Sequence, residues 1–313
     1  MSRKQKEVED NNEVDYSEED LSLGTIVKGY SGFYYVVSDG VEYECSLRGK
    51  NRKKKVKFLP GDKVRFFKGE GTLGGAIESV LPRKNELLRP PVANLDQLLI
   101  LSAICDPLPD FRLIDRLTIF AQWNEIQPVL CFNKCDLGTE EMRKEIADRF
   151  QASGFPVLFC STVTGEGIPE LRERLEGTFS VLAGNSGVGK SSVMNAVSEK
   201  WKQQTGHVSE KLKRGRHTTR HVELFQLNAD TLLADTPGFS TLILPTDIKR
   251  EELCKLFPEF LPLLGECRFS TCLHKSEPDC AVKEALEAGK IHPDRYESYL
   301  AFLEEVIQEE RRF

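Results

Sequence analysis

The sequence has no long apolar run. Its longest, residues 98–104, falls far short of the roughly 20 residues that a transmembrane helix needs. The first residues also lack the apolar core of a secretory signal, because an acidic stretch follows Arg3, Lys4 and Lys6. Nine cysteines among 313 residues are too few for a disulfide scaffold. We therefore expect a cytoplasmic protein without a membrane segment, whose cysteines are free thiols or metal ligands.

The basic residues are concentrated in one part of the chain. Residues 21–89 carry 14 basic and 7 acidic side chains, although the whole chain has a net charge of −6. Six of the eight residues 50–57 are basic. Such a local excess is typical of a surface that binds a polyanion, although a solvated hairpin loop would have the same composition.

Two N-terminal segments differ in their pattern. Residues 1–20 are acidic and nearly without apolar side chains, which predicts a disordered tail. Residues 21–89 contain five short β-prone runs separated by turns, which predicts an all-β barrel of the OB-fold type that binds RNA. The aromatic side chains of this segment either stack on nucleic-acid bases or fill the barrel core; they are Tyr30, Phe33, Tyr34 and Tyr35.

Residues 90–245 alternate between apolar strand-like runs and amphipathic helical runs. The strands are expected at 98–104, 127–132, 156–160, 179–183 and 232–234. The helices are expected at 111–123, 140–153, 168–176 and 190–198. This alternation predicts an α/β domain with a mostly parallel sheet that helices cover on both faces.

A phosphate-binding loop directly follows the strand at 179–183. Its residues are Gly184, Asn185, Ser186, Gly187, Val188, Gly189, Lys190, Ser191 and Ser192. The glycines let backbone N–H groups wrap the phosphates, Lys190 reaches the β- and γ-phosphates, and Ser191 offers a hydroxyl to Mg²⁺. After the strand at 232–234, Asp235 supplies a carboxylate near that Mg²⁺, and Gly238 brings a backbone N–H close to the γ-phosphate.

Two further loops indicate which base is bound. Asn133, Lys134 and Asp136 follow one strand, and Asp136 can accept from both N1–H and the exocyclic amine of guanine. Ser161 and Thr162 follow the next strand and begin a second loop. The pair resembles the guanine-contacting loops of translation-factor-like GTPases. We therefore predict GTP or GDP, bound with Mg²⁺, as the nucleotide.

The order of these motifs is permuted. The base-reading loops precede the phosphate loop, so the segment resembles the circularly permuted GTPases. Similar segments in such relatives favour Thr219, with Thr218 as the alternative, as the threonine that binds Mg²⁺. Phe239 stands where many GTPases have the glutamine that orients the attacking water. We expect His217 to take that role, with His221 as the alternative.

A second ligand cluster lies near the C-terminus. Cys267, Cys272, His274 and Cys280 fall within fourteen residues. Three thiolates and an imidazole suit tetrahedral Zn²⁺, and four protein ligands indicate a structural site. The remaining six cysteines have no comparable spacing, and we expect them to be inert. A final helix at 293–310 places Tyr296, Leu300, Leu303 and Ile307 on one face, which predicts a mainly helical zinc-binding domain over residues 246–313.

Together these motifs resemble the family of the bacterial ribosome small subunit-dependent GTPase A over residues 21–313. The resemblance depends on NKCD, TGEG, GNSGVGKS, GRHTT, DTPGF and the zinc spacing, which stand in the family's order. It implies a monomer that binds the small ribosomal subunit and its rRNA and hydrolyses GTP in a late maturation or checkpoint step, stimulated by that subunit.

Two other functions are consistent with parts of the sequence. A metabolic P-loop kinase or ATPase would have the phosphate loop, but Asp136 disfavours adenine. A GTP-gated RNA-binding adaptor with negligible turnover is suggested by Phe239, because an apolar ring cannot orient water. Comparing GTP with ATP affinity, and turnover with and without the correct partner, separates these possibilities.

Overall fold

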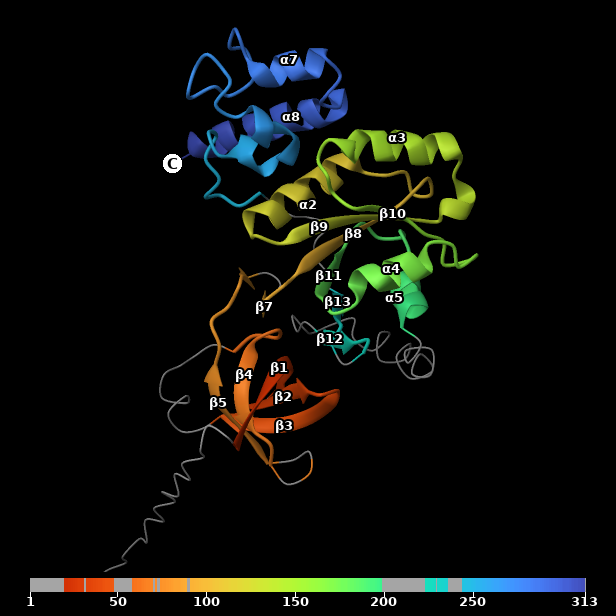
Figure 1. Cartoon of the computed structure of the whole chain (residues 1–313), viewed down its shortest axis with the longest axis vertical. Helices are drawn as coiled ribbons and strands as arrows, with labels where there is room; N and C mark the ends of the chain where they lie inside the picture. Colours follow the sequence, from red (N-terminus) through yellow and green to blue (C-terminus); the bar gives the residue numbers. More distant parts are fainter. Residues whose placement is uncertain are drawn as a thin grey trace, which may run out of the picture. The chain divides into compact units, whose positions relative to one another are not determined.

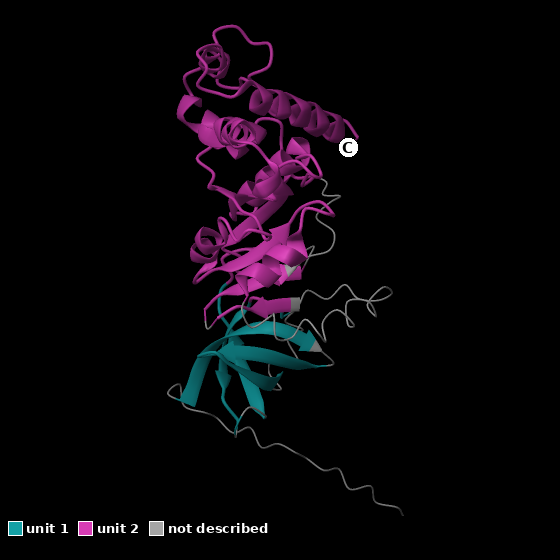
Figure 2. Cartoon of the chain, turned by 90° about the vertical axis from the view of Figure 1, so that its right-hand side faces the viewer, with its two compact units in different colours: residues 1–58, 62–82 teal, residues 59–61, 83–313 magenta. Residues whose placement is uncertain are grey.

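The computed structural model describes residues 20–30, 32–47, 58–69, 71, 74–88, 91–198, 223–228, 230–235 and 244–312. The contacts between residues divide the chain into two compact units (Figure 2). The first comprises residues 1–58 and 62–82, and the second comprises residues 59–61 and 83–313. The second unit contains both the predicted GTPase segment and the predicted zinc segment, so the boundary between them at residue 245 stays a prediction.

The first unit is a closed five-stranded barrel. Its strands are β1 (Leu21–Tyr30), β2 (Phe33–Ser38), β3 (Val41–Leu47), β4 (Lys63–Phe67) and β5 (Gly75–Val80). They neighbour one another in the order β1-β2-β3-β5-β4, and β4 pairs with β1 to close the barrel. Only the β3–β5 pair is parallel. This arrangement confirms the predicted OB-type barrel.

Alternating side chains of these strands fill the barrel. The core consists of Ile26, Val36, Cys45, Phe58, Val64, Phe66 and Ile77. Tyr34 packs on Phe58 with its ring centroid 5.1 Å away, so it belongs partly to this core. Phe33 is 47% exposed and is free to contact a ligand. The core role is thus confirmed in part for Tyr34, and stacking on nucleic-acid bases stays a prediction for Phe33.

The second unit is built on a six-stranded sheet. Its strands are β8 (Gln97–Ala103), β9 (Gln127–Asn133), β10 (Val157–Phe159), β11 (Phe179–Ala183), β12 (Glu223–Gln226) and β13 (Leu232–Asp235). The order is β10-β9-β8-β11-β13-β12, and β12 alone runs antiparallel to its neighbour. A separate hairpin of β6 (Glu86–Leu88) and β7 (Pro91–Ala93) precedes it.

Four helices cover the two faces of this sheet (Figure 1). They are α2 (Phe111–Trp123), α3 (Glu140–Gln151), α4 (Ile168–Leu175) and α5 (Lys190–Val197). Figure 1 shows α2 and α3 on one face and α4 and α5 on the other. Because both faces are covered, every residue of β8 is buried. Side-chain caps fix two helix starts: Asp110 accepts from the amide of Leu113, and Thr139 accepts from the amide of Met142.

The C-terminal segment of this unit is mainly helical. It contains η4 (Leu253–Leu256), η5 (Pro258–Leu263), α7 (Ala281–Glu287) and α8 (Pro293–Glu310). Tyr296, Leu303 and Ile307 of α8 are buried, and Leu300 packs against the same cluster, which confirms the predicted apolar face. The cluster also includes Ile119 of α2, so this segment shares its core with the helix that covers the sheet.

A buried group of charges joins four elements of the second unit. Asp115 of α2 accepts from Arg295 of α8 at 2.6 Å and from Arg149 of α3 at 2.7 Å. Arg295 also pairs with Glu259 of η5 at 2.7 Å. Each carboxylate offsets a cation that is removed from water, which a buried charge requires.

Across the described portion of the chain, no helix combines the length and apolar character needed to cross a membrane.

Candidate functional site

The phosphate loop connects β11 to α5. Gly184, Gly187 and Gly189 have φ of 144°, 83° and 93°, which side chains rarely adopt. A Cβ at Gly184 would lie 2.0 Å from the carbonyl oxygen of Leu101. One at Gly189 would lie 2.4 Å from Nδ2 of Asn133. Gly184 and Gly189 therefore need glycine both for backbone conformation and for space, whereas Gly187 needs it for conformation alone.

Lys190 is held against the loop that it follows in the sequence. Its Nζ donates to the carbonyl oxygens of Gly184 at 2.9 Å and Asn185 at 2.7 Å. Ser191 and Ser192 are exposed in the first turn of α5, and Ser186 is exposed on the loop. The ammonium group, the hydroxyls and the loop amides thus gather at one helix N-terminus, where an anion is stabilised.

The first base-reading loop is joined to the phosphate loop by a hydrogen bond. The buried side chain of Asn133 donates from Nδ2 to the carbonyl oxygen of Val188 at 3.0 Å. Lys134 has φ of 61°, and its Nζ donates to the carbonyl oxygen of Asp106. Asp136 is exposed, so its carboxylate is accessible to a base.

The second base-reading loop is joined to the first. The Oγ of buried Ser161 donates to Oδ1 of Asp136 at 2.5 Å. That same Oγ accepts from the amides of Val163 at 3.2 Å and Thr164 at 3.1 Å. Thr162, which follows Ser161 in the chain, is partly buried. The structure therefore brings both predicted guanine loops and the phosphate loop to the same edge of the sheet.

Two side chains of this site were not assigned from the sequence. Arg143 of α3 donates to Glu166 of the second loop at 2.6 Å and to the carbonyl oxygen of Cys135 at 3.2 Å. Glu166 lies within a recognised loop, but nothing in the local pattern links it to an arginine 23 residues away. Their contact depends on the neighbouring positions of β9 and β10 in the sheet.

The switch residues are only partly covered by the structure. Asp235 is the last residue of β13 and pairs with Leu182 of β11, which places it next to the strand that leads into the phosphate loop. The other assigned positions lie outside the described residues; they are His217, Thr218, Thr219, His221, Gly238 and Phe239. The basic residues 50–57 also lie outside them.

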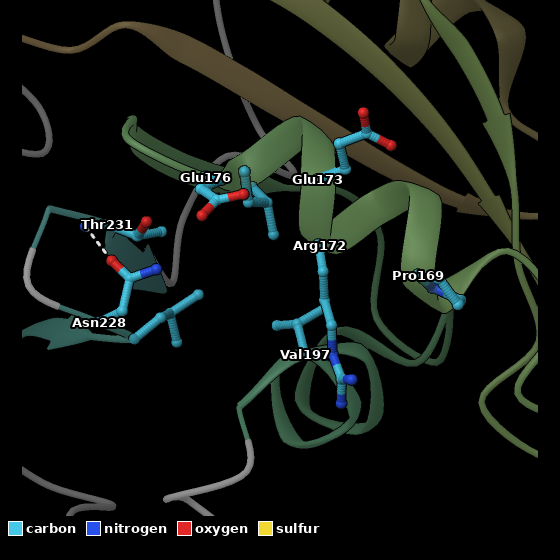
Figure 3. A pocket seen from close by; sticks show the side chains of 9 residues that line it. Pro169, Arg172, Glu173, Glu176, Val197, Asn228 and Thr231 are labelled. Carbon is cyan, nitrogen blue, oxygen red and sulfur yellow. Dashed lines mark hydrogen bonds between the residues drawn. The ribbon is translucent and has the colours of Figure 1, made fainter.

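A cavity of about 430 Å³ lies elsewhere on the GTPase segment, between α4, the end of α5 and the β12–β13 hairpin (Figure 3). Arg172 and Val197 line it from the helices, and Asn228 and Thr231 line it from the hairpin. The Oδ1 of Asn228 accepts from the amide of Thr231 at 2.8 Å. None of the predicted nucleotide ligands lines this cavity, so we assign it no part in GTP binding.

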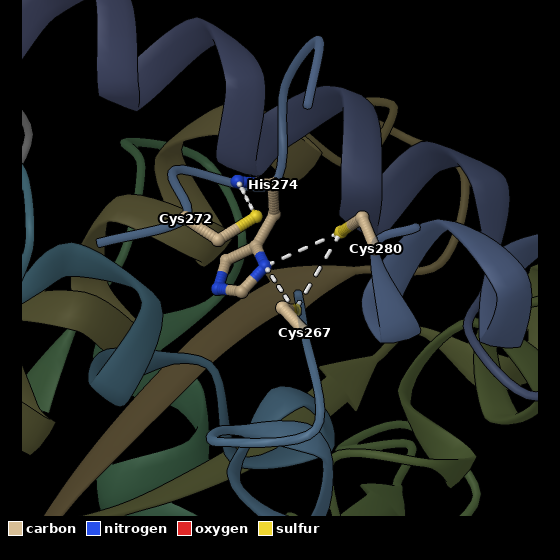
Figure 4. A group of neighbouring side chains, drawn as sticks. All are labelled: Cys267, Cys272, His274 and Cys280. Carbon is tan, nitrogen blue, oxygen red and sulfur yellow. Dashed lines mark hydrogen bonds between the residues drawn. The ribbon is translucent and has the colours of Figure 1, made fainter. Parts of the chain in front are cut away.

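The four predicted zinc ligands converge (Figure 4). The ligand atoms of Cys267, Cys272, His274 and Cys280 all lie within 4.8 Å of one another. Nδ1 of His274 is 3.5 Å from Sγ of Cys267 and 3.4 Å from Sγ of Cys280. Neighbouring ligands around a tetrahedral zinc ion lie at such separations, so the donor set fits Zn²⁺.

The surrounding side chains hold the zinc-ligand loop in place. The Tyr296 hydroxyl donates to the carbonyl oxygen of His274 at 2.6 Å, and the Tyr299 hydroxyl donates to that of Leu273 at 2.8 Å. Burial lowers the pKa of His274, which keeps the imidazole neutral and able to ligate. Burial also raises the pKa of Cys272 to about 12, so a thiolate there needs a nearby cation.

One pair among the other cysteines is grouped in space. The thiols of Cys131 and Cys160 lie 3.5 Å apart and are fully buried. The sequence spacing did not indicate this pair, because it arises from two neighbouring parallel strands. A thiol hydrogen bond and burial raise the pKa of Cys131 well above its usual value, which keeps it protonated and unreactive.

Comparison with known proteins tests these assignments. The family model described as RsgA GTPase matches residues 80–245, and the model described as RsgA N-terminal domain matches residues 23–75. The chain belongs to the RsgA GTPase family. Two solved structures are similar to it over most of their length. YjeQ from Thermotoga maritima is 36% identical with a TM-score of 0.79, covering 92% of this chain and 99% of that one.

The other comparisons agree with membership of the RsgA family. YloQ, described as a circularly permuted GTPase, is 32% identical with a TM-score of 0.78 and covers 94% of this chain and 98% of its own. A Carboxydothermus hydrogenoformans protein named small ribosomal subunit biogenesis GTPase RsgA is 48% identical over 92% of this chain and 99% of that protein. A Moorella thermoacetica protein of the same name is 47% identical over 93% and 99%.

Membership of the RsgA family distinguishes between the functions that the sequence left open. The chain is a GTP-hydrolysing enzyme, which confirms the prediction of a permuted GTPase. The kinase or ATPase alternative and the adaptor with negligible turnover both lose support. The relatives from Carboxydothermus and Moorella are named for small ribosomal subunit biogenesis.

Proposed function

We propose that this RsgA-family GTPase binds the small ribosomal subunit in its GTP form and hydrolyses GTP in a late maturation or checkpoint step. The subunit stimulates hydrolysis, and the protein leaves with GDP. The observation that carries the proposal is the joining of three loops into one site, through Asn133 to Val188 and through Ser161 to Asp136. The curated relatives named for small-subunit biogenesis supply the partner.

The phosphate end of the site would hold the triphosphate and Mg²⁺. Lys190 and the loop amides would stabilise the β- and γ-phosphates, since the glycine conformations leave room for a close backbone approach. Ser191 would offer its hydroxyl to Mg²⁺, and Asp235 would contribute a carboxylate nearby. Thr219 is proposed as the further Mg²⁺ ligand, with Thr218 as the alternative. Bound Mg²⁺ offsets the negative charge of the phosphates.

The guanine end of the site would set the base preference. Asp136 is exposed and oriented by Ser161, so it can accept from N1–H and the exocyclic amine of guanine. Adenine presents neither donor in that arrangement. We propose that His217, or His221, orients the attacking water in place of the missing glutamine.

The barrel would bind rRNA. Phe33 is exposed on β2, and the basic residues 50–57 belong to the same unit of the chain. Aromatic faces beside lysine and arginine side chains suit single-stranded or distorted RNA.

The zinc cluster would be structural, because all four tetrahedral positions are filled by protein. We propose that the protein acts as a cytoplasmic monomer.

Co-sedimentation with purified ribosomal subunits tests the partner and its nucleotide dependence. The protein is mixed with small or large subunits and a non-hydrolysable GTP analogue, GDP or an ATP analogue. We expect it to pellet with small subunits in the GTP analogue and to be released in GDP. Lys190→Ala serves as the control that lacks the nucleotide response. Equal binding to large subunits, or binding independent of nucleotide, would contradict the proposal.

A further inference from the structure

The guanidinium group of Arg143 lies where the two guanine-reading loops meet. Nη1 donates to Oε1 of Glu166 at 2.6 Å, and Nη2 donates to Oε2 at 3.3 Å. The same Nη2 donates to the carbonyl oxygen of Cys135 at 3.2 Å. One side chain of α3 therefore contacts both loops, and its bidentate geometry with the carboxylate fixes their relative orientation.

These contacts close into a ring. The carbonyl of Cys135 belongs to the peptide that leads into Asp136, and the Asp136 carboxylate accepts from Oγ of Ser161 at 2.5 Å. The amide of Ser161 donates to the carbonyl oxygen of Glu166 at 2.9 Å. The Glu166 side chain then returns to Arg143. The two loops are thus joined beside the base-reading carboxylate, at the arginine, and through the Cys135 thiol, which donates to Oε2 of Glu166 at 3.4 Å.

We propose that Arg143, paired with Glu166, is a positioning residue for guanine recognition. It holds the peptide between Cys135 and Asp136 at the angle from which the Asp136 carboxylate meets both N–H donors of guanine. This inference rests on the guanine site of the proposed function, but it does not depend on the ribosome.

The electrostatics keep the pair intact. The hydrogen bond from Arg143 lowers the pKa of Glu166, and the same contact raises the pKa of Arg143. Both groups are therefore charged at neutral pH. Arg143 is 22% exposed at its side chain, and its other acidic neighbour, Glu140, is 3.6 Å away and 83% exposed. Glu140 contacts neither loop in the described structure, which makes it a matched control for a loss of one negative charge.

The base chemistry gives the test a readout that a general loss of stability would not produce. Guanine offers N1–H and an exocyclic amine to Asp136, whereas hypoxanthine offers N1–H alone. A displaced Asp136 carboxylate should lose more binding free energy with guanine, where it must accept from two donors at once, than with hypoxanthine, where it accepts from one. Loss of the Arg143–Glu166 pair should therefore weaken the binding of GTP and GDP equally and weaken the binding of ITP less. The contacts with the phosphates should not change.

The experiment measures dissociation constants of fluorescent GDP and GTP analogues, with competition by ITP, for the full-length protein. The variants are Arg143→Ala, Arg143→Lys, Glu166→Gln, the double variant Arg143→Ala with Glu166→Gln, and Glu140→Gln. Hydrolysis at saturating GTP, the melting temperature and zinc content are measured in parallel. We expect about tenfold weaker binding of GTP and GDP for Arg143→Ala and Glu166→Gln, which is the effect of one charge-assisted contact.

The remaining variants separate loss of the Arg143–Glu166 pair from other causes of weaker nucleotide binding. Arg143→Lys should fall between wild type and Arg143→Ala, since an ammonium group cannot make the bidentate contact. The double variant should be no weaker than either single variant. Unchanged affinity in Glu166→Gln or Arg143→Lys, an unaltered preference for GTP over ITP, or a fully additive double variant would overturn the proposal. Failure of the wild type to bind guanine nucleotides would instead contradict the proposed function.

Discussion

At the scale of single residues, the phosphate loop depends on one ammonium group. Lys190 donates to two carbonyl oxygens of the loop that precedes it, so the loop holds its ammonium group at the proposed phosphate site. A cation held in place loses little conformational freedom on binding phosphates, and its contacts with them are charge-assisted. The same residue therefore contributes to the shape of the loop and to its charge.

Lys190→Ala should weaken GTP binding by about 10- to 100-fold, the range expected for loss of charge-assisted hydrogen bonds. Equilibrium binding of a fluorescent GTP analogue measures the effect. Lys144→Ala, an exposed lysine-to-alanine change on α3, is the control for loss of one positive charge. Wild-type affinity in Lys190→Ala would remove this residue from the phosphate site.

Cys267 tests the zinc assignment. Cys267→Ser removes one thiolate from the cluster, and we expect loss of bound zinc and a lower melting temperature. Metal analysis of the purified protein gives the zinc content, and thermal unfolding gives the stability. Cys105→Ser, at a cysteine far from the cluster in sequence, is the control. A stoichiometric zinc content in Cys267→Ser would show that the four side chains do not form the site.

The sequence patterns indicated the candidate ligands but not the side chains that support them. The phosphate loop, Asp136 and the zinc cluster could be proposed because each motif lies within a short stretch of sequence. Arg143, Tyr296 and Tyr299 were not found as supporting residues. Their partners are set by strand order and helix packing, which a single sequence does not display.

At the scale of elements, the buried charges tie the helices of the second unit together. Asp115 receives Arg149 from α3 and Arg295 from α8, and all three side chains are buried. Each ion is removed from water and depends on its partners, so loss of one leaves an uncompensated charge. The network therefore specifies how α2, α3 and α8 pack.

Arg295→Met should lower the free energy of unfolding by about 3–5 kcal/mol, because it leaves Asp115 and Glu259 short of a partner. Arg268→Met is the control, since the pair of Arg268 with Asp279 is 63% and 66% exposed and should cost about 0–1 kcal/mol. Urea unfolding followed by circular dichroism measures both. Equal losses in the two variants would mean that the buried network adds nothing specific.

The strongly periodic elements were predicted well. The helix Phe111–Trp123 and the strand Phe179–Ala183 have the expected bounds, whereas β10 is confined to Val157–Phe159 within the expected 156–160. The β6–β7 hairpin was not predicted, because its three-residue strands carry too little periodicity. The 3-10 helices η4 and η5 were missed for a related reason, since Pro258 and Pro262 interrupt any α-helical pattern.

At the scale of the whole molecule, charge is divided between the parts of the chain. The barrel segment is basic, whereas the protein as a whole has a net charge of −6. Such a division directs a polyanion to one part of the chain and keeps it from the rest.

The order of the GTPase motifs is also a property of the whole chain. The circular permutation could be predicted from the sequence because it depends only on the order in which the motifs occur.

Binding of nonspecific single-stranded RNA tests the role of the basic segment. If the barrel and residues 50–57 neutralise about six phosphates, the log–log dependence of affinity on salt should have a slope of about −4. Replacing the six basic residues of 50–57 by glutamine should reduce the slope toward zero without changing GTP affinity. A slope near zero in the wild type would exclude this segment from RNA binding.

The rate of GTP hydrolysis tests most directly whether the small ribosomal subunit activates this GTPase. The purified protein is assayed alone and with vacant small subunits, large subunits or free RNA, and with Lys190→Ala throughout. We predict stimulation by small subunits only, of about 10³- to 10⁵-fold if the subunit completes the catalytic site. No stimulation in Lys190→Ala is expected. Equal rates in every mixture would contradict activation by the small subunit.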